Sequence, residues 1–319
     1  MASYSTRVKN ELSKLPLEES CCIAAETLGL FRMNGAMILE KGQWGALFET
    51  RSASTAHLFL TLVRRSGLQL ATETAIQKTT KLQKKNLYQL RLLPSKETLS
   101  WLKALGIISE KGLNMSGDKA FIRKHCCQRS YLRGAFLGGG SVNKPEGRYH
   151  LELATGSGEF AQFLQKMLMK FGLNPKISER SEEYVVYLKE GDAITHFLQI
   201  IGATTTLLEF ENMRILKERR EYANRASNCE VANVQKTVNT AVRQLEIIDG
   251  LRKANLLEKL PLSLREAAIL RWRYPEESLK DLASRFSGNL SKSGLNHRFK
   301  KLEFCGLKLL EELRTEKNK

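Results

Sequence analysis

Six cysteines are the side chains of this sequence best suited to metal or redox chemistry. They occur as two adjacent pairs and two single residues: Cys21, Cys22, Cys126, Cys127, Cys229 and Cys305. Structural zinc sites usually draw on pairs spaced C-x-x-C, because an adjacent pair leaves little room to turn both thiolates towards one ion. We therefore expect small, buried, apolar cysteines, with no metal site and no cofactor.

A second group of side chains with binding chemistry lies towards the C-terminus. Ser291 can cap a helix whose Leu295, Phe299 and Leu302 form a buried face. The opposite face of this helix and the preceding short helix carry the candidate DNA-binding residues, which are Ser278, Lys280, Ser291, Lys292, Ser293, Asn296, His297, Arg298, Lys300 and Lys301. Asn and Lys can pair with adenine and guanine edges, and Lys300 and Lys301 are expected at phosphates. His297 is equally consistent with a side chain that only faces solvent.

The elements around these residues follow the helix-turn-helix plan. Ser263 and Glu266 have the spacing of a capping box that opens a helix ending before Pro275. Ser278 opens the short helix, and residues 287–289, Ser-Gly-Asn, favour a tight turn. In such motifs the second helix enters the major groove with its N-terminal residues at base edges. Three-helix bundles that bind no DNA can look similar.

The charge of the chain points to a polyanionic partner. Fifty-one Lys and Arg face 34 Asp and Glu, which gives +17 and a pI near 9.6. Phosphate contacts by such a surplus release counterions and supply affinity, so we expect double-stranded DNA as the partner, although a ribosomal protein would be as basic. No apolar run is long enough for a membrane span and no signal peptide is evident, so we expect a cytoplasmic, nucleoid-associated protein without a membrane partner.

An internal repeat organises the N-terminal part. Residues 21–35 and 126–140 align with both cysteines, a central glycine, a phenylalanine and a terminal glycine in register. After each copy, the spacing of apolar residues alternates in the same order between a period of 2 residues, typical of strands, and one of 3.6, typical of helices. Each copy therefore predicts helix, two strands, helix, two strands, helix.

The predicted fold class is α+β, with two pseudo-symmetric αββαββα repeats followed by an all-α helix-turn-helix domain. The predicted divisions are a repeat domain over 1–205 (repeats about 1–110 and 120–205), a linker helix over 206–224 and a C-terminal domain over 225–319.

The repeated peptide resembles the LAGLIDADG signature of homing endonucleases. That resemblance implies two motif helices packed at a pseudo-twofold axis, with Gly29 and Gly134 at the close approach. In the family an acidic residue near each helix end holds a divalent metal for phosphodiester hydrolysis. The matching positions here are Asn34 and Gly139, and the guanidinium of the neighbouring Arg32 would repel Mg²⁺. We therefore expect a retained fold without catalytic residues.

Further basic and amide side chains are candidates for contacts to the DNA backbone. In the first repeat they lie on the strands that would form a DNA-binding saddle, together with Arg91, and are Lys78, Lys81, Lys84 and Lys85. On the helix after the linker they are Arg225, Asn233 and Lys236. Both sets are as consistent with solvated surfaces.

Four segments of the chain resemble the WhiA family of Gram-positive bacteria: LGLFRMNG, YLRGAFLGGGSV, NRASNCEVANVQKT and LSKSGLNHRFKKL. The resemblance covers nearly the whole chain. It implies a transcriptional regulator of sporulation and cell division, linked to chromosome segregation, with a degenerate homing-endonuclease domain and a reader like region 4 of sigma factors. The residues themselves indicate DNA binding and lost catalysis, whereas the cell-division role comes from the resemblance alone.

The leading hypothesis is a sequence-selective DNA-binding transcriptional regulator that is not an enzyme. One alternative is a divalent-metal-dependent DNA endonuclease. Another is a nucleoid-associated adaptor whose N-terminal half binds a protein, with a sigma factor or another transcription or division protein as the open candidate.

Overall fold

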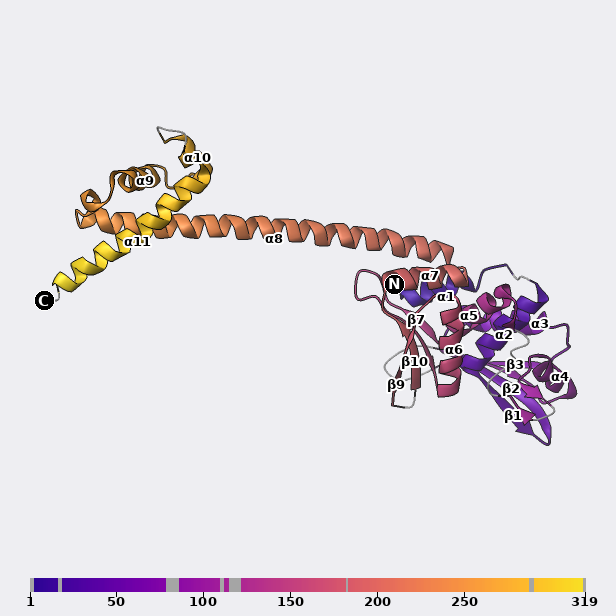
Figure 1. Cartoon of the computed structure of the whole chain (residues 1–319). Coiled ribbons are helices and arrows are strands. Elements are labelled where there is room, and N and C mark those ends of the chain that lie inside the picture. Colours follow the sequence, from indigo (N-terminus) through magenta and orange to yellow (C-terminus); the bar gives the residue numbers. More distant parts are fainter. Residues whose placement is uncertain are drawn as a thin grey trace. The chain divides into compact units, whose positions relative to one another are not determined.

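The chain forms two compact units, each with its own hydrophobic core. The computed structural model describes residues 3–16, 19–78, 86–109, 112–114, 122–181, 183–286 and 290–317. The N-terminal unit spans Met1–Glu218 and the C-terminal unit spans Arg219–Lys319 (Figure 1). Separate clusters of buried apolar side chains form the two cores.

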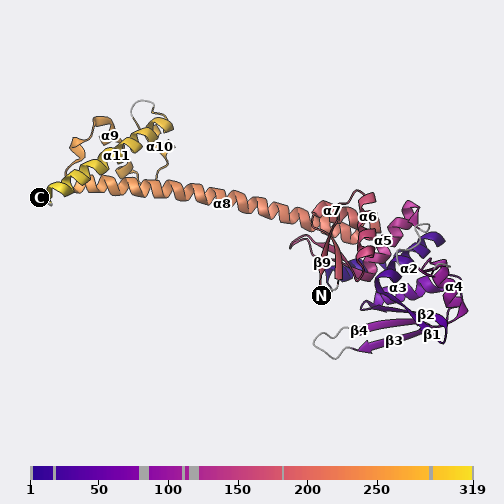
Figure 2. The ribbon, with the colours of Figure 1, turned by 60° about the horizontal axis from the view of Figure 1, so that its bottom comes forward.

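The first repeat of the N-terminal unit combines one antiparallel sheet with helices. Its elements are α2 (Ser20–Asn34), β1 (Gly35–Glu40), β2 (Gln43–Thr50), α3 (Ala53–Arg64), β3 (Thr72–Lys78), β4 (Asn86–Leu92) and α4 (Lys96–Ala104). The strand order is β1-β2-β4-β3, and α2 and α3 cover one face of the sheet (Figure 2). The alternation of buried Ala46, Phe48 and Thr50 along β2 explains this one-sided packing.

The second repeat has the same order of elements. They are α5 (His125–Gly139), β7 (Gly140–Val142), β8 (Leu151–Thr155), α6 (Gly158–Lys170), β9 (Lys176–Arg180), β10 (Glu183–Leu188) and α7 (Gly191–Ile201). Its sheet order, β7-β8-β10-β9, reproduces the order of the first sheet. The predicted pair of αββαββα repeats is therefore confirmed.

Two additions to the repeats were not predicted. Helix α1 (Tyr4–Leu12) starts at the cap Ser3 and buries Tyr4, Val8 and Leu12, which lie on one helical face. A short ribbon, β5 (Ile108–Ser109) with β6 (Gly112–Leu113), follows α4. Helix α1 contacts α3, α5 and β7, so it joins both repeats.

A single helix of 50 residues, α8 (Thr204–Lys253), begins in the N-terminal unit and ends in the C-terminal unit. The sequence predicted a linker helix over 206–224 and a new domain from 225, but the structure has no break there. The physical reason is that residues 204–249 contain neither glycine nor proline, so nothing in the backbone ends the helix.

The C-terminal unit is helical, as predicted. After α8 come the 3-10 turn η2 (Leu257–Lys259), α9 (Leu262–Arg273), α10 (Leu279–Ser284) and α11 (Lys292–Lys317). The predicted capping box at Ser263 is wrong: α9 begins at Leu262, after Pro261, two residues before the start that a cap at Ser263 would set, so Ser263 already lies within the first turn. In the described part of the chain, no helix is both long and apolar enough to cross a membrane.

Candidate nucleic-acid interface

The N-terminal part of α11 lies on the core of the C-terminal unit. Its Leu295, Phe299 and Leu302 are fully buried, as their helical spacing predicted. Leu282 and Ala283 of α10 are buried in the same cluster, and α11 contacts both α9 and α10. This packing fixes α11 along one face and leaves its other face towards solvent.

Serine caps set the start of both helices of the motif. The Ser278 hydroxyl oxygen accepts a hydrogen bond from the Asp281 backbone N–H at 3.3 Å, and its O–H donates to the Asp281 carboxylate at 2.7 Å. The Ser291 hydroxyl oxygen accepts from the Gly294 N–H at 3.1 Å. Both predicted caps are confirmed. The hydroxyl of Ser278 is thus engaged within the protein, and residues 287–289 lie outside the described residues.

The predicted reading face of α11 is largely exposed. Ser291, Lys292, Ser293, His297, Lys300 and Lys301 are exposed, Asn296 and Arg298 are half-buried, and Lys280 is exposed on α10. The Arg298 guanidinium lies 5.0 Å from the centre of the Phe286 ring, which turns it aside from the exposed face.

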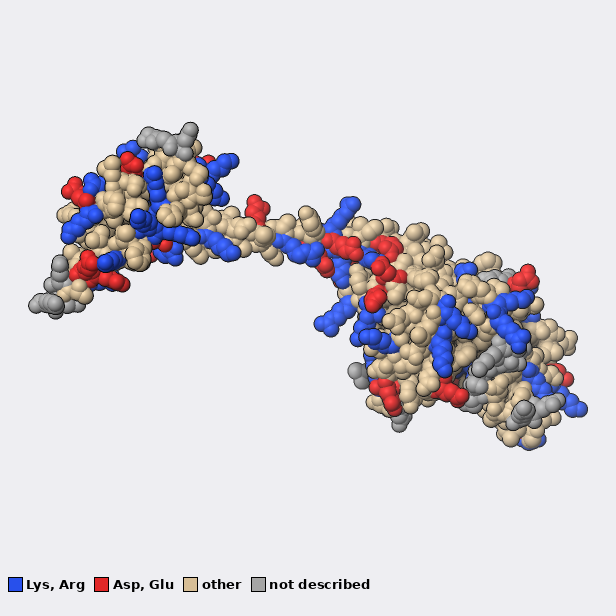
Figure 3. Space-filling view, viewed as in Figure 1, with Lys and Arg blue, Asp and Glu red and all other residues tan. Residues whose placement is uncertain are grey.

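The lysines of this face are available to an anionic partner. Within the described residues no ion pair holds Lys292, Lys300 or Lys301, whereas Arg243 on α8 pairs with Glu303 at 2.7 Å. Figure 3 shows that Lys and Arg side chains lie over both units instead of in one tail. These lysines, beside a half-buried amide and exposed hydroxyls, match the chemistry needed for phosphates and base edges.

A buried arginine that sequence reasoning missed holds α8, α9 and the start of α10 together. Arg271 is only 2% exposed; its guanidinium donates to the Gln244 side-chain oxygen at 3.2 Å and to the Glu277 carbonyl at 2.7 Å. It also lies 5.2 Å from the centre of the Phe299 ring on α11. Burial lowers the pKa of this guanidinium from its ordinary value. Its helical spacing from Leu264 and from Ala267–Ala268 was the signal that could have placed it inside.

The three backbone candidates on α8 are exposed but lie in different environments. Arg225 lies 3.9 Å from Glu221, one turn earlier. The Asn233 amide lies 3.9 Å from the sulfur of Cys229, and Lys236 is exposed. Since all side chains over 221–239 are exposed, their contribution to a DNA contact stays a prediction.

In the N-terminal unit the two motif helices, α2 and α5, pack at a glycine-mediated close approach. A Cβ atom at Gly29 would lie 2.3 Å from the Tyr131 carbonyl oxygen, and one at Gly134 would lie 2.2 Å from the Glu26 carbonyl oxygen. A buried ion pair between Arg133 and Glu26, at 3.3 Å, also joins the helices. The glycines have the role that the sequence predicted.

The helix ends that would carry metal-binding acids carry none. Helix α2 ends at Asn34 and α5 ends at Gly139. A cleft of about 720 Å³ is lined by Asn34 and Gly138 together with Lys9 of α1 and Glu49 of β2. Among the described residues lining it, Glu49 is the one carboxylate, and its oxygen accepts a hydrogen bond from the Gln89 amide at 2.5 Å.

Lys9, which sequence reasoning missed, places an amine in this cleft. Burial lowers the pKa of Lys9 to about 8. A lysine opposes a divalent cation by charge, so the cleft is a poorer metal site than Glu49 alone would suggest.

Comparison with known proteins assigns all three parts of the chain to one family. Residues 20–108 match the WhiA N-terminal LAGLIDADG-like domain, residues 128–220 the WhiA LAGLIDADG-like domain and residues 223–305 the WhiA C-terminal HTH domain. A "Probable cell division protein WhiA" from Heliobacterium modesticaldum is 41% identical over 304 residues, 94% of this chain and 95% of the relative. The chain belongs to the WhiA family.

Other relatives agree with this assignment. The "Probable cell division protein WhiA" of Desulfitobacterium hafniense is 40% identical over 311 residues, 97% of either chain. Among solved structures, full-length DUF199/WhiA from Thermatoga maritima matches with a TM-score of 0.59 and 26% identity, covering 96% of this chain and 99% of that one. The family resemblance predicted from the sequence is confirmed.

In this WhiA-family chain the guanidinium of Arg32 does not lie where the sequence predicted it, beside the former metal-binding positions. Arg32 does not line the cleft of Asn34; its guanidinium donates to the Asn114 carbonyl at 2.5 Å and lies 6.0 Å from the centre of the Phe160 ring. Burial lowers its pKa from the ordinary value. The cations that line the cleft of Asn34 are Lys9 and Arg51 instead of Arg32.

The structure describes only part of the predicted phosphate-tracking surface of the first sheet, so that surface stays a prediction. Lys78 pairs with Asn86 in a register that puts it on the same face as the buried Leu90 and Leu92, opposite to Arg91. Arg91 is ion-paired with Glu40. Lys81, Lys84 and Lys85 lie outside the described residues.

Proposed function

We propose that this WhiA-family protein is a sequence-selective DNA-binding transcriptional regulator without nuclease activity. The observation that carries the proposal is the exposed Lys292, which no described residue holds in an ion pair, beside Asn296 on the first turns of a packed, capped second helix. In helix-turn-helix proteins these turns face base edges in the major groove. The match to an HTH domain over residues 223–305 supports the same reading.

The residues of α11 divide into two roles by position. Lys292, Ser293 and Asn296 lie in the first turns and would contact base edges, with Asn suited to adenine and Lys to guanine. Lys300 and Lys301 lie further along the helix and would contact phosphates, which adds affinity without sequence information. His297 lies between the two groups along the helix and is exposed.

The test begins with selection of a preferred duplex from random DNA by the full-length protein. Kd is then measured for that duplex by fluorescence anisotropy with each variant. Lys292→Ala and Asn296→Ala should each cost about 1–3 kcal/mol, roughly 5- to 150-fold in Kd. Lys301→Ala should weaken all duplexes alike and reduce the salt slope by about 1.

A matched control is Lys308→Ala, an exposed lysine further along the same helix and 4.0 Å from Glu312. It should leave Kd within about twofold, since surface charges away from the contact contribute little. Unchanged affinity in the double variant of Lys292 and Asn296 would refute the assignment of the reading helix. Absence of any salt-sensitive affinity for duplex DNA would refute DNA binding altogether.

The cellular role is proposed from the relatives. The two relatives above are named as probable cell division proteins, which supports a role of this chain in division. Sporulation, chromosome segregation, nucleoid association and a sigma factor or other protein partner rest on the family resemblance alone. Genome-wide mapping of bound DNA, compared between the native chain and the Lys292→Ala variant, tests them together.

The nuclease alternative lacks the carboxylates that a two-metal or one-metal mechanism needs at the helix ends. Its remaining candidate is Glu49, in the cleft with Lys9. Plasmid cleavage in Mg²⁺ or Mn²⁺ that Glu49→Gln abolishes would establish the nuclease and overturn the proposed lack of activity.

A further inference from the structure

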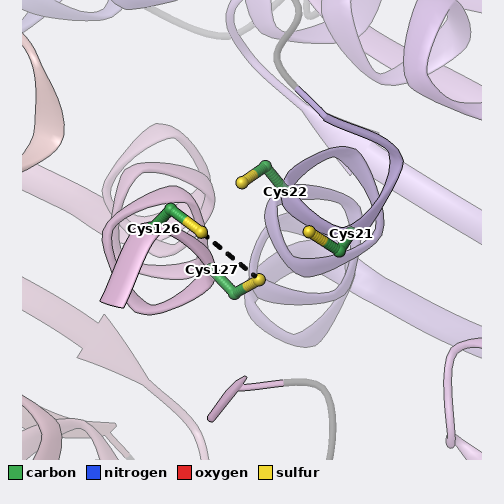
Figure 4. Close-up of side chains that lie close together, drawn as sticks. All are labelled: Cys21, Cys22, Cys126 and Cys127. Carbon is green, nitrogen blue, oxygen red and sulfur yellow. Dashed lines mark hydrogen bonds between the residues drawn. The ribbon is translucent and has the colours of Figure 1, made fainter. Parts of the chain in front are cut away.

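Four cysteines that are far apart in the sequence meet where the two motif helices begin. Cys21 and Cys22 lie in the first turn of α2, and Cys126 and Cys127 lie in the first turn of α5. All four Sγ atoms lie within 4.8 Å of one another. Figure 4 shows the sulfur atoms of the two pairs turned towards each other from facing helix ends.

The sequence predicted no metal site because its cysteines occur as adjacent pairs, and this cluster shows why that geometric argument does not hold. One adjacent pair cannot easily surround an ion, but two pairs on facing helices each supply two sulfur atoms to the same space. The close approach of α2 and α5 at Gly29 and Gly134 creates the facing arrangement. Sequence spacing alone could not reveal it, because the pairs belong to different repeats.

The distances fit one small tetrahedral ion. A Zn–S bond of about 2.3 Å places tetrahedral sulfur ligands roughly 3.8 Å apart. The Cys126 and Cys127 sulfurs are 4.0 Å apart, and no pair in the cluster exceeds 4.8 Å. Side-chain adjustments of less than about 1 Å would therefore complete the site. An iron–sulfur cluster would need its thiolates farther apart, because several metal and sulfide atoms lie between them.

Burial as small apolar residues does not account for the whole cluster. Cys22 and Cys127 are each only 2% exposed, but Cys126 is exposed and Cys21 is half-buried. An exposed thiol gains nothing from apolar burial, and it leaves a route by which an ion can enter.

Burial raises the pKa of the Cys22 and Cys127 thiols, but other features of the surroundings favour negative charge at the cluster. Neither α2 nor α5 has a side-chain cap, and all four cysteines lie in the first turns of these helices, where the partial positive charge of the helix N-terminus favours an anion. Lys124 directly precedes α5. Ser130 lies next to this cluster and accepts a hydrogen bond from Arg133 at 3.0 Å, which leaves its own O–H to donate to the Cys22 sulfur. Such a hydroxyl supports a metal-bound thiolate.

We propose that Cys21, Cys22, Cys126 and Cys127 bind one Zn²⁺ ion as a tetrathiolate site that joins the N-terminal ends of the two motif helices. Binding replaces four thiol protons by one ion and changes no oxidation state. The site lies at the opposite ends of these helices from Asn34 and Gly139, so the ion has a structural role and no contact with the former catalytic positions.

The first test uses the reduced, untagged, full-length protein after removal of metal by a chelator. Added Zn²⁺ should remain bound at one ion per chain through dialysis, as measured by elemental analysis. Because Cys126 is exposed and Cys21 is half-buried, a thiol reagent should react with both in the metal-free protein and with neither when Zn²⁺ is present. Added Co²⁺ should give the visible absorption bands of a tetrahedral cobalt thiolate, and Zn²⁺ should remove them.

The variants separate a specific site from nonspecific thiol binding. Cys126→Ser is suited to this test because Cys126 is exposed, so the fold should tolerate the change. It should lose the cobalt bands and the retained zinc. Cys229→Ser, an exposed cysteine in the C-terminal unit, is the matched control and should keep both.

Two results would overturn the proposal. One is that, in the native chain with excess metal, Cys21 and Cys126 react with the thiol reagent as they do without metal and no cobalt thiolate bands appear. The other is a disulfide within the cluster, seen as a mass loss of two hydrogens per bond, in protein kept with equimolar Zn²⁺. Since DNA binding by α11 is measured separately, either result leaves the proposed function standing.

Discussion

Replacement of Gly29 by alanine tests the packing on which the N-terminal unit depends. The added methyl carbon would lie 2.3 Å from the Tyr131 carbonyl oxygen, whereas ordinary carbon–oxygen contacts are about 3.3–3.6 Å. The neighbour is backbone and cannot rotate away, so the helices must separate locally by about 1 Å. Fully buried Leu30 and Leu132 of the two helices would lose contacts as they move.

The expected change in the free energy of unfolding follows from two opposing effects of the added methyl group. Overpacking in a core costs about 1–3 kcal/mol, and a clash with backbone belongs at the upper end. The better helix propensity of alanine returns about 1 kcal/mol. The variant should therefore be about 2 kcal/mol less stable, which lowers Tm by roughly 4–8 °C for a unit of this size.

Differential scanning calorimetry of the full-length chain measures this change. The control is Gly156→Ala, because Gly156 is exposed and a Cβ there would meet no atom within 4 Å. Its Tm should shift by no more than about 1–2 °C. An unchanged or raised Tm for Gly29→Ala would refute the close packing of α2 against α5, since helix propensity would then be the larger effect.

Three further changes test the charged and polar interior. Arg271→Met should lower the free energy of unfolding of the C-terminal unit by about 3 kcal/mol in urea denaturation, because it leaves buried acceptors without a donor; a loss below about 0.5 kcal/mol would contradict that role. Glu26→Ala should destabilise the N-terminal unit more than the double change with Arg133→Met, because the single change removes the carboxylate that lies 3.3 Å from a buried guanidinium and keeps the guanidinium; a double variant that is the less stable would contradict this. The pKa of Lys9 in the folded chain is about 8, which is lower than its value in the unfolded chain. The free energy of unfolding therefore decreases as pH falls from about 10.4 towards 8, and it stays at the lower value below pH 8. Lys9→Met should accordingly raise Tm relative to the native chain at pH 7 and much less at pH 10, and an equal Tm difference at both pH values would contradict the lowered pKa.

The sequence by itself determined the repeat and the type of most elements. Apolar periodicity is a local property, so strands such as β2 and helices such as α6 could be predicted from a few neighbouring residues. The same holds for the caps Ser278 and Ser291 and for the buried face of α11, because each depends on residues within two helical turns. Helix α1 was missed although its Tyr4, Val8 and Leu12 follow the same period.

The chemistry of the candidate sites depended on contacts between distant segments, and only the tertiary structure could decide them. The convergence of two cysteine pairs requires the packing of α2 on α5, and the amine in the cleft comes from α1, which precedes the repeat. The face occupied by Lys78 follows from strand register, since a shift of one residue would reverse it. Local patterns specify which face of an element is buried, whereas the partner that buries it is fixed only when the whole core is packed.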